Sequence, residues 1–394
     1  MTYFDSIEKA PSDPILGLTL AYREDTRDQK VNLGVGAYKN AEGNPQVLTC
    51  VRKAEQHILN QQLNKEYLPI QGDDDYIRET LSLIFGKNCD KERIFGAQTV
   101  GGTGALRIGG EFLFDQKLST TIFLSNPSWG NHRPIFRRSG LKIDTYDYYD
   151  PQHHRLDFPG MCASIKKMPP GSTILMQPCC HNPTGVTPSL DQWKELSELI
   201  QHQKVIPFFD LAYQGFEKGL DEDAAVIRYF MDQGHEMLVA SSYSKNFGLY
   251  GERVGHLAVV ASNSKSAEAL GTQVKQIIRG CYSMPPLQGA RIVKTILGSS
   301  ELRAEWEQEL DTIRLRINEM RHALASGIGE QNFSFVDQQT GMFSFSGLNQ
   351  DQVNRLKQEY GIYMLSNGRL SISGLNTHNM NYVIKALLSV KEPS

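Results

Sequence analysis

Short apolar segments alternate with longer amphipathic segments over residues 46–298, and this alternation is the strongest constraint on the fold. The short segments are rich in β-branched and aromatic residues, whereas the longer ones repeat apolar residues at spacings of three and four. Strands and helices that alternate in this way form parallel α/β sheets, because each helix returns the chain to start the next strand in the same direction. The pattern predicts strands at 121–125, 173–176, 205–210, 238–242 and 256–260, and a covering helix at 189–202.

The C-terminal part of the chain follows a different pattern. Residues 302–328 keep the helical spacing without a break, which is longer than a usual globular helix, and we interpret this segment as a bridge between two domains. Shorter elements follow it and predict a smaller α+β unit. These are a strand at 342–345, a helix at 350–360, strands at 362–365 and 370–373, and a terminal helix through Leu388.

Composition excludes several classes of function. The 394 residues include 41 basic and 44 acidic side chains, so the chain lacks the positive charge that is typical of nucleic-acid binding. No segment approaches the roughly 20 apolar residues of a membrane span, and the N-terminus does not resemble a signal peptide. The six cysteines form no C-x-x-C pair, which favours a reducing compartment. We therefore expect a soluble cytoplasmic protein whose mature form is the whole chain, with no nucleic-acid or membrane partner.

A glycine cluster precedes one of the helical segments. Gly101, Gly102 and Thr103 come directly before apolar residues at helical spacing, so their backbone N–H groups and the helix N-terminus could bind an anion. The cluster matches neither the dinucleotide fingerprint nor the P-loop spacing, and taken alone it also fits an ordinary tight turn.

A lysine follows the apolar strand at 238–242, where α/β folds present residues to a crevice. If Lys245 loses its hydration there, its pKa falls and its amine can form a Schiff base with a carbonyl. The alternative is a solvated lysine on a loop. Ser242, Ser244 and Arg253 lie near it in sequence and offer what a phosphate group needs, which favours a ligand site.

Asp210 ends another apolar strand, and Tyr213 follows three residues later. A carboxylate at this position either caps the next turn or pairs with a cation in the crevice. A third strand leads to the adjacent residues Cys179, Cys180 and His181, which could suggest a metal. Contiguous residues cannot easily share one ion and no second ligand pair lies at zinc spacing, so we predict no metal site.

Four motifs occur together in sequence order: Asn182-Pro183-Thr184-Gly185, Asp210 with Tyr213, Ser242-x-Ser244-Lys245, and Arg253. In this the chain resembles the class I aminotransferases, specifically the aspartate and aromatic-amino-acid aminotransferases. The resemblance extends from Asp13-Pro14-Ile15-Leu16 to Ser366-Asn367-Gly368-Arg369, essentially the full length. It implies an α/β enzyme of fold type I that uses pyridoxal 5′-phosphate (PLP), built from a large domain on a mostly parallel seven-stranded sheet and a smaller α+β domain.

The resemblance also implies an organisation of the chain. It predicts an N-terminal arm at 1–12, a small domain formed by 13–45 and 312–394, and a large PLP-binding domain at 46–311. The active enzyme would be a homodimer whose active sites lie between subunits.

Catalytic roles are implied residue by residue. Lys245 would bind the cofactor covalently and, once released by the substrate amine, would move a proton between the substrate and the cofactor. Asp210 would pair with the pyridine N–H, and Trp129 would stack on the ring. Tyr213 and Asn182 would hydrogen-bond the phenolic oxygen of the cofactor.

Anion sites are implied as well. The phosphate group would bind the amides of Gly101, Gly102 and Thr103, with Ser242, Arg253 and a tyrosine lent by the partner subunit, which Tyr67 matches. Arg369 matches the socket for the substrate α-carboxylate, assisted by Gly36, Asn182 and Trp129. Arg279 matches the arginine that the other subunit lends to a side-chain carboxylate, since guanidinium binds carboxylate with two parallel hydrogen bonds.

The predicted reaction is transfer of the amino group of L-aspartate to 2-oxoglutarate, which gives oxaloacetate and L-glutamate. The alternative is an aromatic-amino-acid aminotransferase with aspartate as a secondary substrate, because those relatives also keep the arginine at 279. Met284, Gly130 and Asn367 depart from common family residues and could reshape the pocket. A PLP-binding regulator without turnover and a PLP-dependent lyase are the other classes that we weighed.

Overall fold

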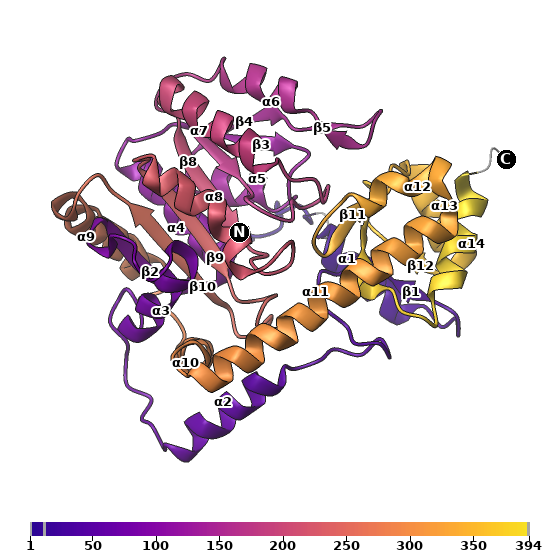
Figure 1. The fold of residues 1–394 in the computed structure, drawn as a ribbon, viewed down its shortest axis with the longest axis horizontal. Helices are drawn as coiled ribbons and strands as arrows, with labels where there is room; N and C mark the ends of the chain where they lie inside the picture. The colour runs from indigo at the N-terminus through magenta and orange to yellow at the C-terminus, as the bar shows by residue number, and fades with distance from the viewer. Residues whose placement is uncertain (1, 11–12, 392–394) are drawn as a thin grey trace.

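The computed structural model describes residues 2–10 and 13–391, and its centre is a seven-stranded sheet (Figure 1). The strand order is β2-β10-β9-β8-β7-β3-β4, and β10 alone runs antiparallel to its two neighbours among the pairs described. The predicted mostly parallel seven-stranded α/β sheet is therefore confirmed. The strands are β2 (Ile94–Val100), β3 (Thr121–Asn126), β4 (Lys142–Asp147), β7 (Thr173–Met176), β8 (Ile206–Leu211), β9 (Met237–Ser242) and β10 (Val254–Val260).

Helices cover both faces of this sheet, as the alternating pattern predicts. Leu106 of α4 (Gly101–Asp115) and Val274 of α9 (Ser264–Cys281) belong to one buried apolar cluster with the strands. Trp193 of α7 (Leu190–Gln203) and Phe230 of α8 (Leu220–Asp232) belong to another. The predicted helix at 189–202 is confirmed as α7, which begins with a capping box between Ser189 and Gln192.

A single long helix, α11 (Ser300–Ile328), connects the region of the sheet with the C-terminal elements (Figure 1). It contacts α2 (Thr49–Asn60) and α10 (Leu287–Leu297), and also α12 (Glu330–Asp337) and α14 (Met380–Lys391). Trp306 is fully buried on it and donates a hydrogen bond from Nε1 to the backbone carbonyl of Asn246, 2.7 Å away. The helix predicted at 302–328 is thus present, and it reaches the residue next to Lys245.

Two small sheets lie among the C-terminal elements. Strand β1 (Val31–Asn32) pairs in parallel with β12 (Ile362–Tyr363), and β11 (Phe343–Phe345) pairs antiparallel with β13 (Arg369–Ser371). The first pair brings an N-terminal segment into the C-terminal unit. The predicted helix at 350–360 is confirmed as α13 (Gln350–Tyr360). The domain borders themselves remain predictions.

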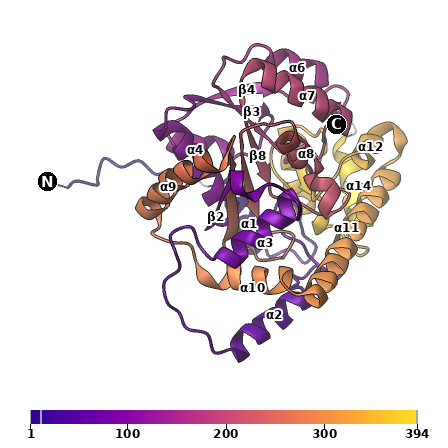
Figure 2. The same cartoon turned by 60° about the vertical axis from the view of Figure 1, so that its left-hand side comes forward.

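The other elements complete the two regions. The N-terminal segment predicted as an arm has no helix or strand in residues 2–10 and extends away from the rest of the molecule (Figure 2), while residues 1, 11 and 12 lie outside the described part. No helix among the described residues is both long and apolar enough to cross a membrane. The remaining elements are α1 (Pro14–Glu24), α3 (Asp74–Phe85), η1 (Lys91–Arg93), α5 (His132–Arg138), β5 (Tyr149–Asp150), β6 (Arg155–Leu156), α6 (Phe158–Ile165) and η2 (Ile372–Gly374).

Candidate active site

A cavity of about 240 Å³ lies at the carboxyl ends of β7, β8 and β9, beside the start of α4 and next to β11 and β13. This is the edge at which parallel α/β sheets bind ligands. The structure brings most of the predicted site residues together around it. These are Gly36, Gly102, Thr103, Trp129, Asn182, Asp210, Tyr213, Ser242, Lys245, Arg253 and Arg369.

Lys245 lies in the turn that follows β9, and its side chain is partly buried where it lines the cavity. Its Nζ is 5.1 Å from the ring centre of Tyr213. Burial lowers the pKa of Lys245 below its ordinary value of 10.5, while the charge of Asp210 opposes that shift. A lysine in this state is more often neutral, so its nitrogen is available as a nucleophile towards a carbonyl carbon.

Asp210 is in β8 and lines the cavity. Nε2 of His132 lies 3.0 Å from Oδ2 of Asp210, and Nδ1 of His132 lies 2.8 Å from Oγ of Ser128. The Trp129 ring meets the His132 ring edge-on at 5.1 Å. His132 was not predicted as a site residue. Its spacing of three from Trp129, at the start of α5, is the sequence signal that could have indicated it.

The start of α4 forms a cradle for an anion. Gly101 has φ +67°, and a Cβ on it would lie 2.4 Å from Nη2 of Arg253, so glycine is needed both for the backbone and for the close approach. Arg253 donates from Nη1 to the backbone carbonyl of Tyr250 at 3.0 Å, and within the described residues no carboxylate forms an ion pair with it. Ser242 donates to Ser244 at 3.1 Å nearby.

This donor set fits a phosphate group. Helix N-terminal amides, two hydroxyls and a guanidinium without a carboxylate partner are the groups that proteins use to bind phosphate. Gly101 itself does not line the cavity; it flanks Arg253 instead.

Arg369 lies on β13 and forms a second anion site. It donates from Nη1 to Oδ1 of Asn182 at 3.1 Å and from Nη2 to the backbone carbonyl of Gly34 at 2.7 Å. Its guanidinium carbon is 4.0 Å from the ring centre of Phe343, a residue that sequence reasoning missed. Burial lowers the pKa of Arg369 to about 10, so the group remains charged at neutral pH. Within the described part of the chain, its buried Nε has no hydrogen-bond partner.

These contacts leave Arg369 able to accept a ligand. Its two hydrogen-bond partners among the described residues are neutral oxygens, and a buried cation with only neutral partners is best stabilised by a carboxylate. Tyr213 faces the same space. Burial raises the pKa of Tyr213 above its usual range, against the opposing effects of Arg369 and of a hydrogen bond with Asn182.

Besides Gly101, two predicted site residues lie outside this cavity. Tyr67 is 82% exposed and Arg279 is also exposed, so neither contributes to the cavity of its own chain. Their segments lie side by side, because the backbone N–H of Leu68 donates to Sδ of Met284 at 3.0 Å and Arg279 donates to Ser283. The assignment of both residues to a partner subunit stays a prediction.

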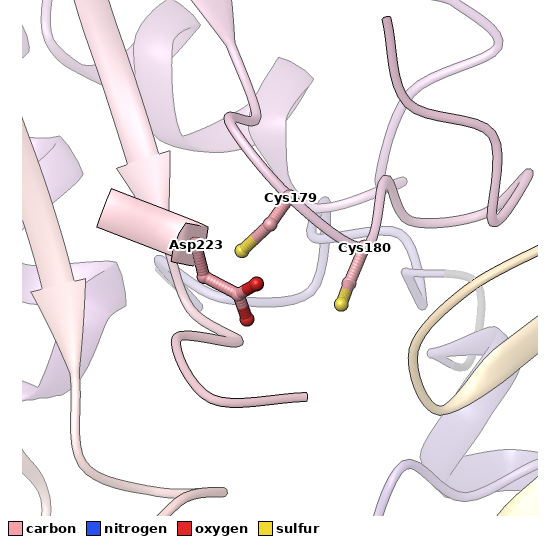
Figure 3. Close-up of side chains that lie close together, drawn as sticks. All are labelled: Cys179, Cys180 and Asp223. Atoms are coloured by element: carbon pink, nitrogen blue, oxygen red, sulfur yellow. The ribbon is translucent and has the colours of Figure 1, made fainter. Parts of the chain in front are cut away.

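Cys179, Cys180 and Asp223 form a buried cluster (Figure 3). The two Sγ atoms and a carboxylate oxygen of Asp223 all lie within 4.8 Å of one another. Asp223 is in the first turn of α8, and its carboxylate accepts hydrogen bonds from the backbone N–H groups of Gly215, Glu217, Lys218 and Gly219. A hydrogen bond to Cys180 and burial raise the pKa of the Cys179 thiol, and burial raises the pKa of Cys180 to about 11. The thiols therefore keep their protons at neutral pH, and Asp223 acts as a cap for the preceding loop.

Comparison with known proteins gives one consistent family. The sequence matches the family described as aminotransferase class I and II over residues 28–387. It is 46% identical to the aspartate aminotransferase of Salmonella typhi and 45% identical to that of Escherichia coli (strain K12), over 98% of this chain and 100% of each relative.

Solved structures of that family have the same fold. The aromatic-amino-acid aminotransferase from Burkholderia pseudomallei, covalently bound to pyridoxal phosphate, is 42% identical with a TM-score of 0.96, and the match covers 100% of both chains. The psychrophilic aromatic amino acids aminotransferase from Psychrobacter sp. B6, cocrystallised with aspartic acid, is 38% identical with a TM-score of 0.96, over 99% of this chain and 100% of that one.

Proposed function

This chain belongs to the class I and II aminotransferase family, and from that premise we propose that it transfers the amino group of L-aspartate to 2-oxoglutarate, giving oxaloacetate and L-glutamate. The enzyme is a PLP-dependent aminotransferase of fold type I. The observation that carries an amino-acid substrate is the buried Arg369, whose guanidinium has only neutral hydrogen-bond partners among the described residues and so can bind an α-carboxylate. Relatives at 43–46% identity over nearly the whole chain are named aspartate aminotransferase.

The cavity residues divide into groups that would hold the cofactor and groups that would act on the substrate. The amides of Gly102 and Thr103, the Ser242 hydroxyl and Arg253 would bind the phosphate group, with Gly101 allowing Arg253 to approach. Asp210, held by His132, would accept a hydrogen bond from the ring nitrogen, and Trp129 would stack on the ring. Bound PLP supplies an electron sink that stabilises negative charge at the substrate α-carbon.

Lys245 would act twice in this scheme. Its neutral amine would hold the cofactor covalently, and, once free, the same amine would accept the proton from the substrate α-carbon and carry it to the cofactor side. Burial favours both roles, because the lowered pKa keeps a share of the amine unprotonated. Tyr213 and Asn182 would hydrogen-bond the phenolic oxygen of the cofactor and hold its ring in place.

Arg369 would bind the α-carboxylate of the substrate through a two-pronged contact, with Gly36 and Asn182 alongside. This orients the α-carbon towards Lys245. The second carboxylate of aspartate would bind Arg279 of the partner subunit, and Tyr67 of the partner subunit would reach the phosphate group. The site is therefore complete only in a homodimer, which we place in the cytoplasm.

A half-reaction assay tests the substrate assignment. The PLP-loaded protein is mixed separately with aspartate, glutamate, tyrosine and phenylalanine, and the loss of the lysine-bound cofactor absorbance is followed. Fast conversion by aspartate and glutamate with slow conversion by the aromatic amino acids supports the proposal. Comparable or faster aromatic rates would favour the second candidate, an aromatic-amino-acid aminotransferase, which the similarity to solved enzymes of that name supports. No conversion of any amino acid would contradict both.

A further inference from the structure

Gln177 follows β7 directly and lines the cavity with a buried side chain. Its Oε1 accepts a hydrogen bond from the backbone N–H of Asn182 at 2.9 Å, and its Nε2 donates to the backbone carbonyl of Asn182 at 3.3 Å. Asn182 belongs to no helix or strand. The side chain of Gln177 therefore forms hydrogen bonds with both the N–H and the C=O of a buried loop residue. In a sheet, a neighbouring strand would supply these two hydrogen bonds.

The residue that Gln177 holds has two neighbours in the site. Oδ1 of Asn182 accepts from Nη1 of Arg369 at 3.1 Å, and because guanidinium carries no acceptor, the amide must present its oxygen to Arg369. The Nδ2 group of Asn182 is then free to donate to Tyr213, and this hydrogen bond lowers the pKa of the Tyr213 phenol. The orientation of Asn182 thus affects two parts of the site at once.

We propose that Gln177 is a positioning residue that fixes Asn182 between Arg369 and the phenolic oxygen of the cofactor, and so links cofactor protonation to the substrate-carboxylate site. The inference rests on the proposed function, which places Asn182 at that oxygen. Gln177 touches neither substrate nor cofactor in this role. It acts by restricting the backbone of Asn182. The Nδ2 donor of Asn182 is then already in position, so cofactor binding does not have to supply the entropy cost of ordering it.

A purely structural role for Gln177 predicts a loss of stability and nothing more, and the chain offers a matched control for it. Gln339 is also buried and makes the same pair of bonds to one backbone residue: its Oε1 accepts from the N–H of Phe345 at 3.0 Å, and its Nε2 donates to the carbonyl of Phe345 at 3.3 Å. Gln339 does not line the cavity. Gln177→Met and Gln339→Met therefore remove the same two contacts from different places.

The test is a pH titration of the absorbance of the lysine-bound cofactor in the full-length, PLP-loaded protein. Gln177→Met should move the midpoint upward by about 0.5–1 pH unit, because a less ordered Asn182 donates less well to the anionic oxygen. The KM for aspartate should rise roughly three- to ten-fold, since Arg369 is less well placed. Gln339→Met should lose a similar amount of thermal stability and leave the midpoint unchanged.

A double variant separates action through Asn182 from a general effect. In an Asn182→Ala background, Gln177→Met should produce no further shift of the midpoint. An unshifted midpoint in Gln177→Met, an equal shift in Gln339→Met, or a full additional shift in the Asn182→Ala background would each overturn the inference. The wild-type half reaction is measured alongside: a wild-type chain that converts no amino acid contradicts the proposed function, whereas an unshifted titration in an active Gln177→Met variant contradicts only the role of Gln177.

Discussion

Nε2 of His132 lies 3.0 Å from Oδ2 of Asp210, and both side chains are buried, with Asp210 lining the cavity. The other ring nitrogen of His132 lies 2.8 Å from the Ser128 hydroxyl. The imidazole is therefore fixed from both sides, and it fixes one oxygen of the carboxylate. The second oxygen of Asp210 remains for a ligand, which is the arrangement that a carboxylate facing a ring N–H requires.

His132→Leu should weaken cofactor binding about ten-fold, because one oxygen of a buried carboxylate loses its partner and the group is no longer oriented. The dissociation constant is measured by titrating the cofactor-free protein with PLP. His256→Leu is the matched control: His256 is also buried, but neither of its ring nitrogens has a hydrogen-bond partner among residues 2–10 and 13–391, so its replacement leaves no described group unpaired. Unchanged PLP affinity in His132→Leu would show that Asp210 needs no support from the histidine.

The covalent capture of PLP by the cofactor-free protein should depend on pH through Lys245. Burial lowers the pKa of this lysine below 10.5, so the neutral amine that attacks the aldehyde is present at lower pH than in a free lysine side chain. The rate of capture, followed by absorbance, should therefore reach half its maximum at a pH below 10.5.

Lys245→Ala is the control for this measurement. It should fold, bind PLP without the covalent link, and lose roughly four orders of magnitude or more in turnover. Mass spectrometry after borohydride reduction reports the covalent adduct directly. An adduct that persists in Lys245→Ala would place the reactive amine elsewhere.

The strands that the sequence revealed are those with continuous apolar character. β7, β9 and β10 are buried at every position, and the apolar runs predicted them within two residues. The two edge strands were not predicted: the apolar run of β2 is interrupted by Gly96 and Gln98, and β4 is half-exposed with a polar sequence, Lys142–Asp147. The strand order and the antiparallel direction of β10 depend on contacts between segments far apart in the chain, which periodicity does not encode.

The predicted site residues came from the family motifs, and all of them except Gly101, Tyr67 and Arg279 line one cavity. The missed residues include His132, Gln177 and Phe343, which contact Asp210, Asn182 and Arg369, respectively. His132 is 78 positions from Asp210 in sequence, so nothing local indicates that they meet. Tyr67 and Arg279 show the opposite case, since their motifs predict a role that a single chain does not complete.

Asp223 should make the stability of the protein depend on pH. Burial raises its pKa from 3.8 to about 6 in the folded chain. Between these values the folded chain binds a proton that the unfolded chain has released, so its contribution to stability is present at low pH and is lost as the pH rises through about 6.

Asp223→Asn removes this dependence. The free energy of unfolding of the wild type, relative to that of the variant, should fall by about 2 kcal/mol between pH 4 and pH 7. Urea denaturation at several pH values measures it. Asp191→Asn, an exposed position in the first turn of α7, is the control. A difference that is the same at pH 4 and pH 7 would show that Asp223 is ionised throughout.

Arg279→Leu should reduce the rate with aspartate and glutamate about 100-fold and affect tyrosine and phenylalanine far less, because only the dicarboxylates lose a charged hydrogen-bonding partner. Equal losses for both classes would show that Arg279 does not bind the side-chain carboxylate.

Because Arg279 is exposed and does not line the cavity of its own chain, we expect it to act on the active site of the partner subunit. Mixing Arg279→Leu chains with inactive Lys245→Ala chains, under conditions that exchange subunits, should restore about one quarter of the wild-type aspartate activity, since half of the dimers then contain one complete site. If the mixture stays as inactive as its components, the arginine does not act on the neighbouring site.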